Sequence, residues 1–425
     1  MLYGSFQMTS KQDFTWRRVR EEPQSEFSSN NAWNQNFNTS NPGNQNNNNK
    51  NNSNRARAVR RPESPACNVT IEELFQAYYD CRKRKRNSAS ALEFELDLEK
   101  NLIQLYEELI TGVYSPARSI CFAVLYPKPR EIWAAQFKDR IIHHVIYNRT
   151  ADELFKKFIY DSCACIPTKG THFAVMRAEH HLRSATQNWV NEGWVLQLDV
   201  ASFFVSINKQ ILETILDKHT KDDYTFYLSK LVLHNDPTID PIYTSNKNNL
   251  KLIPAHKSLF NARGRGLPIG NLTSQLWANV YLNELDHYAK RVLKIKHYIR
   301  YVDDILIVGD NPQQLLFWAN QLSEYVVENL GLTFHPNKTH IQRANQGINF
   351  VGYILKPWCR YVRQRTIDRL HYRLNTKGET NLINSVNSYF GLLRFCKSWK
   401  FRQRLIPLIE SRGLQVNTQL TKVLK

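Results

Sequence analysis

The stretch that decides the fold runs from Ile299 to Asp310 and reads "IRYVDDILIVGD". Residues 299–302 and 305–308 are rich in β-branched and aromatic side chains, which predicts two strands joined by a tight turn at Asp303 and Asp304. Aspartate is common in turns, and a plain hairpin would need nothing more. However, two adjacent carboxylates between apolar strands repel each other with little screening, which favours a cation-binding site.

A third carboxylate stands in "WVLQLDVASFFVSI", which begins at Trp194. Residues 195–198 predict a buried strand, and Asp199 follows at its end. Asp199, Asp303 and Asp304, with Val200 beside them, offer the hard oxygen ligands that two Mg²⁺ ions need. Two such ions can activate an attacking hydroxyl and stabilise a leaving phosphate. More than 100 residues separate Asp199 from Asp303, so the three carboxylates can share a site only if the fold closes this distance.

The composition narrows the class of protein. The 425 residues carry a formal net charge of +19, and 42% of them are hydrophobic, so a basic protein with a large core is expected. An excess of this size favours a polyanionic partner, most often nucleic acid. Seven cysteines without paired spacing fit a reducing compartment. Because we find neither an apolar leader nor a long apolar run, we expect a cytoplasmic protein with no membrane partner.

Local patterns divide the chain into segments. Residues 1–66 are rich in Asn, Ser and Gln, and we expect them to be disordered. "TIEE", from Thr70 to Glu73, predicts a capping box at the start of the first helix. A second helix is expected over 88–111, burying Leu92, Leu96, Ile103 and Leu109. Strands and helices alternate from Trp194 to Gly352, and basic helices follow beyond Lys356.

Two motifs then point to a known family. Tyr301-Val302-Asp303-Asp304 resembles the Y-x-D-D box of reverse transcriptases, and "LDVASFF" around Asp199 resembles their first catalytic motif. Further motifs follow in the family's order between Ser115 and Phe401. The resemblance implies an α+β right-hand polymerase with fingers, an antiparallel palm and a short helical thumb. The predicted parts are 1–66 (disordered tail), 67–193 (N-terminal helices and fingers), 194–355 (palm with remaining fingers segments) and 356–425 (basic helical thumb).

The resemblance also implies roles for single residues. The catalytic set is Asp199, Asp303 and Asp304, with Lys338 as the general acid that protonates pyrophosphate. Residues expected at the incoming nucleotide are Lys128, Arg130, Phe204, Ile269, Gly270 and Gln275. Residues expected at template or primer are Lys169, Gly170, His172, Tyr301, Phe350, Val351 and Gly352. Phe204 would act as a steric gate against the 2′-hydroxyl. The plainer alternatives are a core phenylalanine, a basic surface loop for Lys128 and Arg130, and a solvent-facing Lys338.

"GLPIGNLTSQ", from Gly266 to Gln275, indicates a subtype. Most reverse transcriptases have Q-G-x-x-x-S-P here, whereas the I-G-x-x-x-S-Q form resembles enzymes of diversity-generating retroelements. Those enzymes copy template adenines inaccurately, and Ile269 cannot make the hydrogen bonds of the usual glutamine. The subtype implies dNTPs, a template-repeat RNA and its cDNA duplex, a small basic accessory protein, and a bacterial or phage origin.

Two alternatives remain. A retron-like or phage-defence reverse transcriptase would share Y-x-D-D but is disfavoured by the I-G-N-L-T-S-Q run. A catalytically idle RNA-binding protein is disfavoured by the three aspartates. The asparagine-rich residues 30–62 carry a separate hypothesis: they resemble the protein sequence that an adenine-rich template repeat encodes. The reading frame would then begin inside such a repeat or a copy of it.

Overall fold

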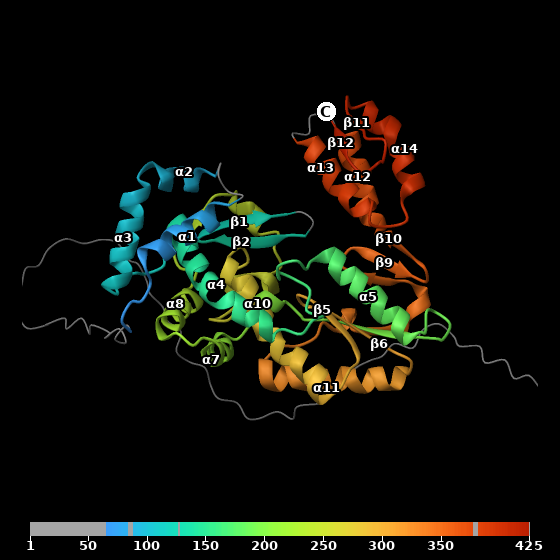
Figure 1. Ribbon diagram of the computed structural model, residues 1–425, viewed down its shortest axis with the longest axis horizontal. Coiled ribbons are helices and arrows are strands. Elements are labelled where there is room, and N and C mark those ends of the chain that lie inside the picture. Colours follow the sequence, from blue (N-terminus) through green and yellow to red (C-terminus); the bar gives the residue numbers. More distant parts are fainter. Residues whose placement is uncertain (1–64, 84–87, 126–127, 377–380, 425) are drawn as a thin grey trace, which may run out of the picture. The chain divides into compact units, whose positions relative to one another are not determined.

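A four-stranded antiparallel sheet forms the centre of the computed structural model, which describes residues 65–83, 88–125, 128–376 and 381–424 (Figure 1). The strand order is β5-β6-β3-β7. The strands are β3 (Trp194–Asp199), β5 (His297–Tyr301), β6 (Asp304–Gly309) and β7 (His340–Arg343). In the register of β3 and β6, Asp199 lies directly opposite Asp304. The two acidic segments are therefore neighbours, as the sequence predicted.

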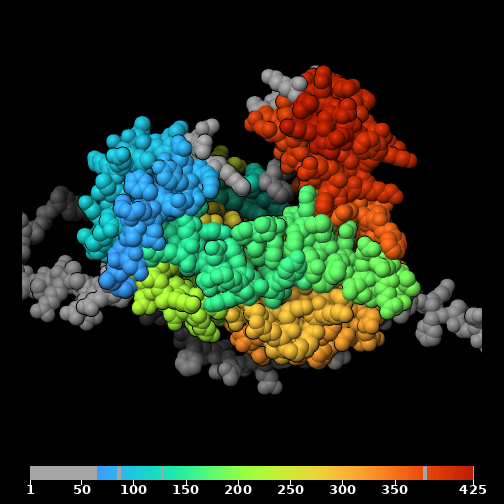
Figure 2. Space-filling model, viewed as in Figure 1, coloured from blue at the N-terminus to red at the C-terminus, as the bar shows by residue number. Residues whose placement is uncertain are grey.

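Alternating side chains of the sheet enter two cores, as strand geometry requires. Ile305 and Ile307 join a core with α10 (Leu272–His287) and α11 (Pro312–Leu330). Leu306 and Val308 join a second core with α5 (Thr171–Ala185) and the C-terminal helices. Figure 1 draws α5 and α11 on opposite sides of β5 and β6, and both helices form part of the outer surface in Figure 2. The central sheet is thus covered on both faces.

A second sheet, in the order β2-β1-β4, belongs to the predicted fingers. Its strands are β1 (Ile120–Val124), β2 (Arg130–Ala134) and β4 (Ile242–Tyr243). The helices that surround the two sheets are α1 (Ile71–Arg82), α2 (Ala89–Leu96), α3 (Leu98–Ile110), α4 (Phe137–Lys157), α6 (Phe203–Ser206), α7 (Lys209–His219), α8 (Asp223–His234) and α9 (Lys247–Leu250). The capping box of α1 is confirmed, because Thr70 and Glu73 exchange both hydrogen bonds.

The single helix expected over 88–111 is wrong. Asp97 adopts φ −128° and ψ 49° and separates α2 from α3. Leu92, Leu96 and Ile103 are 50%, 84% and 50% exposed, so the buried face of these helices is not the predicted one. The buried side chains of this region are instead Ala91, Leu102, Leu105 and, as expected, Leu109.

The basic helices predicted beyond Lys356 begin only after Val362, because one more strand of a sheet comes first. β9 (Tyr353–Lys356) pairs with β8 (Ile348–Phe350) on one side and with β10 (Cys359–Val362) on the other. Pairing with β9 satisfies the backbone of β10, and the sheet continues to Val362. The basic helices follow as α12 (Gln364–Asn375), α13 (Leu382–Leu393) and α14 (Trp399–Glu410), with a small hairpin of β11 (Gln415–Val416) and β12 (Val423–Leu424).

The remaining elements are short. They are η1 (Ala255–Lys257), η2 (Leu259–Asn261), the π-helical η3 (Tyr288–Val292), η4 (Pro336–Lys338) and η5 (Ala344–Gln346). The tail predicted over 1–66 lies outside the described residues, except for Pro65 and Ala66. Among the helices that are described, none has the length and apolar character needed to cross a membrane.

Arg149 of α4 ties the N-terminal helices to the rest of the chain. Its side chain is 17% exposed and donates to Glu73 at 3.0 and 2.6 Å and to Asp222 at 3.2 Å. It also donates to the side chain and backbone carbonyl of Asn68. A single guanidinium therefore joins the cap of α1 to the start of α8.

We predict that Arg149→Met lowers the free energy of unfolding by about 2–3 kcal/mol, because it leaves two carboxylates without their partner. Arg118→Met is the matched control: the Arg118–Asp240 pair is exposed, at 55% and 72%, so its loss costs less than about 1 kcal/mol. Denaturant unfolding measures both. Equal effects of the two substitutions would contradict the assigned role.

Candidate active site

The structure brings the three predicted aspartates together at one end of the central sheet. Asp199 ends β3, Asp304 begins β6 opposite it, and Asp303 lies in the turn before Asp304. Burial and the charges of Asp303 and Asp199 raise the pKa of Asp304 to about 7. Burial and the charge of Asp199 also raise the pKa of Asp303. The carboxylates therefore repel one another in a poorly solvated place and lack sufficient positive charge.

Two of the predicted cations do lie at this cluster. Lys338 of η4 places its Nζ 2.5 Å from Oδ1 of Asp199. The positive charges of Lys338 and Arg130 both act to lower the pKa of Asp303, against the larger effects of burial and Asp199. Arg130 begins β2 and is exposed. The fingers strand and the segment after α11 thus supply charge to the same carboxylates.

The carboxylate oxygens of the three aspartates suit a divalent cation that takes its remaining ligands from water and substrate. Within the described ranges, no three or more His, Cys, Asp or Glu side chains are arranged to hold a metal by themselves. Mg²⁺ commonly takes only one or two carboxylates and completes its shell with water and substrate phosphates. Asp199 already accepts one cation, the ammonium of Lys338. The residues therefore fit Mg²⁺ bound together with a phosphate-bearing substrate.

The backbone at Val200 is compatible with its predicted place among the metal ligands. Val200 forms an isolated bridge with Phe334. The hydrogen bonds of that bridge belong to its neighbours: Ala201 N–H donates to Thr333, and His335 N–H donates to the carbonyl of Asp199. The bridge therefore leaves the carbonyl oxygen of Val200 unused.

Positive charge from four segments gathers at Lys128, and Asp199 lies near enough to act on the same ammonium. The pKa of Lys128 is lowered by burial and by the charges of Lys338, Lys257 and Arg365. Lys257 lies in η1 and Arg365 in α12. Lys257 could not be predicted here, because a lone lysine in a long connection carries no motif. Such a gathering of cations beside acidic ligands is suited to binding a triphosphate.

Arg363 is a further cation beside the aspartates. The charge of Asp304 acts to raise its pKa, although burial lowers the pKa overall. Its Nε is buried and has no hydrogen-bond partner in the part of the chain that the structure describes. Its backbone N–H donates to the carbonyl of Gly352 at 3.2 Å, in the turn between β8 and β9. Arg363 therefore connects the start of the C-terminal helices to the predicted primer-binding turn.

The segment around Ile269 is hydrogen-bonded to strand β2. Trp133 N–H donates to the carbonyl of Ile269 at 2.8 Å, and Asn271 accepts from the N–H of Ala135 at 3.1 Å. Gly270 has a φ of +132°, and a Cβ there would approach the Trp133 carbonyl to 2.6 Å. The backbone is thus fixed, while the Ile269 side chain stays half-buried and Gln275 stays exposed.

Phe204 is the accessible member of the pair that the sequence could not separate. Phe203 is 3% exposed and belongs to the core, whereas Phe204 is only partly buried. The carbonyl of Phe204 accepts from Leu267 N–H at 2.7 Å, which ties α6 to the segment that leads into Ile269. The predicted gate and the predicted nucleotide segment are therefore held next to each other.

Several of the residues predicted at the template or primer make contacts within the protein. Phe350 is 2% exposed and fills the second core. The ammonium of Lys169 donates to the carbonyls of Tyr160 and Ser162. Val351, with φ +39°, and Gly352, with φ +96°, form the turn between β8 and β9. Among the described residues, no atom lies within 4 Å of the position of a Cβ on Gly170 or Gly352, so this part of the chain leaves both backbones open to approach.

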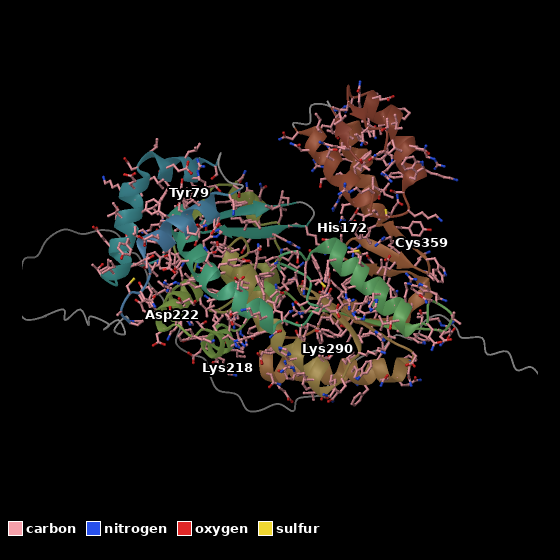
Figure 3. All side chains as sticks on the ribbon, viewed as in Figure 1. Tyr79, His172, Lys218, Asp222, Lys290 and Cys359 are labelled. Atoms are coloured by element: carbon pink, nitrogen blue, oxygen red, sulfur yellow. The ribbon has the colours of Figure 1, made fainter. Side chains whose placement is uncertain are left out.

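His172, at the start of α5, contacts residues of the C-terminal part of the chain. Its ring stacks on Phe395 with centroids 4.0 Å apart, and its Nε2 lies 3.0 Å from the hydroxyl of Tyr353. Figure 3 places His172 at the end of α5 that lies towards β9 and β10. The hydroxyl of Tyr301 lies 3.3 Å from Thr171 beside it. His172 therefore helps to hold α5 against the C-terminal part of the chain.

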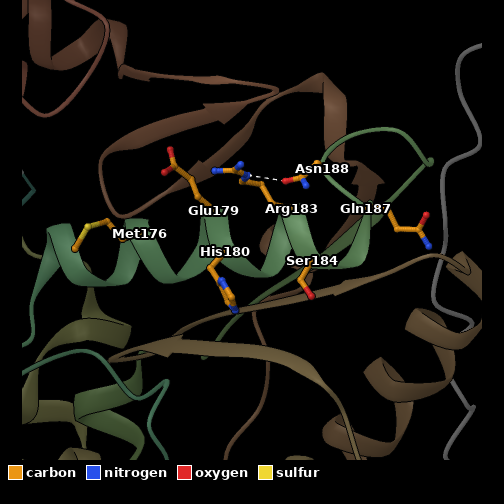
Figure 4. A pocket seen from close by; sticks show the side chains of 7 residues that line it. All are labelled: Met176, Glu179, His180, Arg183, Ser184, Gln187 and Asn188. Carbon is orange, nitrogen blue, oxygen red and sulfur yellow. Dashed lines mark hydrogen bonds between the residues drawn. The ribbon is translucent and has the colours of Figure 1, made fainter.

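A surface cavity of about 490 Å³ lies elsewhere, along α5 and the turn after it (Figure 4). Its lining comes from this one helix and turn, and Arg183 donates to Asn188 within it. The lining residues are Met176, Glu179, His180, Arg183, Ser184, Gln187 and Asn188, none of which the motifs predicted. The cavity is therefore separate from the acidic cluster.

Comparison with known proteins agrees with the geometry. The family described as reverse transcriptase (RNA-dependent DNA polymerase) matches residues 127–355, which is more than half of the chain. The chain therefore belongs to the reverse transcriptase family. The match contains Asp199, Asp303 and Asp304, and it covers the fingers strand β2 and the whole central sheet.

Individual relatives are distant. "Putative COX1/OXI3 intron 2 protein" of Saccharomyces cerevisiae is 21% identical over 281 residues, which cover 56% of this chain and 30% of that protein. "Protein YkfC" of Escherichia coli is 22% identical over 314 residues, which cover 66% of this chain and 77% of that protein. A solved telomerase from Candida albicans, in complex with a fragment of telomeric RNA, overlaps with a TM-score of 0.40 at 13% identity, over 70% of this chain and 55% of that chain.

We predict that Asp304→Asn raises the melting temperature of the metal-free protein at about pH 8. Above a pKa of about 7 the buried carboxylate is charged beside Asp199 and Asp303, which costs stability. As the pH falls through about 7, protonation in the folded state relieves this cost. The gain of the variant should therefore shrink towards about pH 5.

Thermal unfolding in a chelating buffer measures this effect. Asp310→Asn, at the exposed residue after β6, is the control and should leave the melting temperature unchanged at both pH values. A gain of Asp304→Asn that does not depend on pH would contradict the electrostatic explanation.

Proposed function

We propose that this chain is an RNA-directed DNA polymerase that extends a primer on an RNA template with dNTPs. The observation that carries the proposal is the meeting of Asp199, Asp303 and Asp304 at one sheet end, within reach of charge from Arg130 and Lys338. A reaction that joins a hydroxyl to a triphosphate needs both: acidic ligands for divalent ions and cations for phosphate oxygens.

The chain's own groups divide the work as follows. Asp199, Asp303 and Asp304, with the carbonyl of Val200, would hold two Mg²⁺ ions, which when bound activate the primer hydroxyl and stabilise the leaving pyrophosphate. Lys128 and Arg130 attract the triphosphate and orient it towards the carboxylates. Lys338, which is paired with Asp199 in this structure, would donate a proton to the departing pyrophosphate. Phe204 excludes a 2′-hydroxyl through its ring.

We further propose that copying is error-prone at template adenines, as in a diversity-generating retroelement. Ile269 supports this, because an apolar side chain offers no hydrogen bonds whose loss would penalise a wrong pair. Its backbone is fixed to Trp133, so the residue type can be exchanged without moving the segment. The same proposal includes a template-repeat RNA, a small basic accessory protein and a bacterial or phage-encoded enzyme acting in the cytoplasm.

Polymerase activity is tested by extension of a primed RNA template with dNTPs and Mg²⁺, with the accessory protein supplied. We predict that the wild-type chain extends the primer and that Asp303→Ala loses extension while still binding RNA. Asp310→Ala changes an aspartate of the same stretch outside the cluster and should retain full activity. A wild-type chain that binds RNA but is as inert as Asp303→Ala would instead indicate an idle RNA-binding protein.

Fidelity is tested by sequencing products copied from adenine-containing templates. We predict that Ile269→Gln lowers misincorporation opposite adenine several-fold, because the amide restores polar contacts that a wrong pair would leave unpaired. Ile269→Leu keeps the apolar character and should keep the wild-type error rate. Unchanged error rates in the glutamine variant, with extension intact, would contradict the role of Ile269 and leave the polymerase assignment standing.

A further inference from the structure

Arg300 is a charged residue in the middle of the apolar stretch that decides the fold. It lies on β5, and its side chain is 0% exposed. Asp286 of α10, also 0% exposed, accepts from Arg300 Nε at 2.8 Å and from its NH2 group at 2.6 Å. The hydroxyl of Tyr298 donates to the same carboxylate at 2.8 Å. A bidentate ion pair is therefore enclosed directly beneath the acidic turn.

Every N–H group of the guanidinium has an acceptor. Besides the two bonds to Asp286, the NH1 group donates to Asn279 at 3.0 Å and to the carbonyl of Val302 at 2.9 Å. The NH2 group also donates to Ser162 at 3.1 Å. These five bonds match the five donors of arginine. Lysine has three donors on one nitrogen and cannot reproduce this planar fork.

The bond to Val302 acts on a strained position. Val302 is the first residue of the two-residue turn between Tyr301 and Asp304, and its φ is +57°. A β-branched residue rarely adopts this conformation, so the surrounding contacts must hold it there. The next residue is Asp303. A donor fixed on the Val302 carbonyl therefore orients the peptide that leads directly into the two adjacent carboxylates.

The same arginine joins two further segments to the turn. Its backbone pairs with residues 161–163: Arg300 N–H donates to Asp161, and Cys163 N–H donates to Arg300, both at 3.0 Å. Asn279, which accepts from the guanidinium, donates to the carbonyl of Ala164 at 2.8 Å. Arg300 thus connects the segment before α5, helix α10 after the Ile269 segment, and the acidic turn.

We propose that Arg300 is a positioning residue for the reaction: it holds the Val302 carbonyl so that Asp303 and Asp304 face the cations that they bind. This inference rests on the proposed polymerase function. A stabilising role alone is a weaker explanation, since a buried ion pair is often no more stable than apolar side chains of the same volume. Groups that orient metal ligands typically change metal affinity or activity about 10–100-fold when they are replaced.

The test compares Arg300→Lys with Ser162→Ala. The lysine variant keeps the positive charge for Asp286 but loses the fork that reaches Val302. The alanine variant removes one bond from the same guanidinium and leaves the bond to Val302 in place. Unfolding, primer–template affinity, kcat, the KM for dNTP and calorimetric titration of Mn²⁺ are measured for the full chain. The metal titration gives a readout that does not depend on turnover.

We expect Arg300→Lys to fold and to bind primer–template normally, while kcat falls and Mn²⁺ binding weakens, each by about 10-fold or more. Ser162→Ala should stay near wild type in kcat and Mn²⁺ affinity. A folded Arg300→Lys with wild-type kcat and Mn²⁺ affinity overturns the proposal, as does an equal loss in both variants. If Arg300→Lys does not fold, Asn279→Ala decides: losses larger than those of Ser162→Ala support positioning, and equal values overturn it.

Failure of this inference differs from failure of the proposed function. An inactive wild-type chain argues against the polymerase, and the Mn²⁺ titrations of the variants still test the positioning. An active wild type with unaffected variants argues against Arg300 alone.

Discussion

The repulsion among three partly buried carboxylates is the constraint on which the site depends. The register of β3 and β6 sets Asp199 opposite Asp304, and the turn adds Asp303 beside them. Burial and mutual repulsion raise the pKa of Asp304 to about 7, so the folded chain without divalent ions holds an electrostatic cost there. A site of this kind gains most from binding cations, because each ion relieves the repulsion. The same repulsion therefore lowers the stability of the metal-free chain and favours the binding of cations.

Two kinds of positive charge lie near the carboxylates. Exposed positive charge comes from separate segments: Lys338 contacts Asp199, while Lys257 and Arg365 lie near enough to Lys128 to lower its pKa. Arg300 supplies a buried positive charge. Its guanidinium pairs with Asp286 and donates a hydrogen bond to the carbonyl of Val302 in the turn. The exposed cations can exchange partners when a triphosphate arrives, whereas the buried arginine cannot. The two sets therefore suit substrate binding and ligand orientation, respectively.

The sequence predicted the features that depend on local pattern. The two strands around the turn, the strand before Asp199 and the capping box of α1 each follow from side-chain type and spacing within a few residues. It also predicted that the distant aspartates meet, but through the family motifs, since spacing alone cannot close a gap of that length. The order of the motifs was therefore the stronger information about the site.

The sequence failed where long-range packing decides. The break at Asp97 depends on how α2 and α3 meet their neighbours, and β10 exists because β9 offers it an edge. Phe350 matched a primer-binding motif but fills the core. Arg300 was inside the quoted stretch and was passed over, although a charge in a buried strand is itself a signal, because such a charge must have a partner. Lys257 carried no signal of any kind.

The most direct test of the central claim is a structure of the chain with an RNA template, a DNA primer that lacks its 3′-hydroxyl, a matching dNTP and Mg²⁺. The account predicts two metal ions between the dNTP phosphates and Asp199, Asp303 and Asp304, with Lys338 moved from Asp199 towards the phosphates. Arg300 should keep its bond to Val302. A complex in which the nucleotide binds away from the three aspartates, with Lys338 still paired to Asp199, would contradict the account.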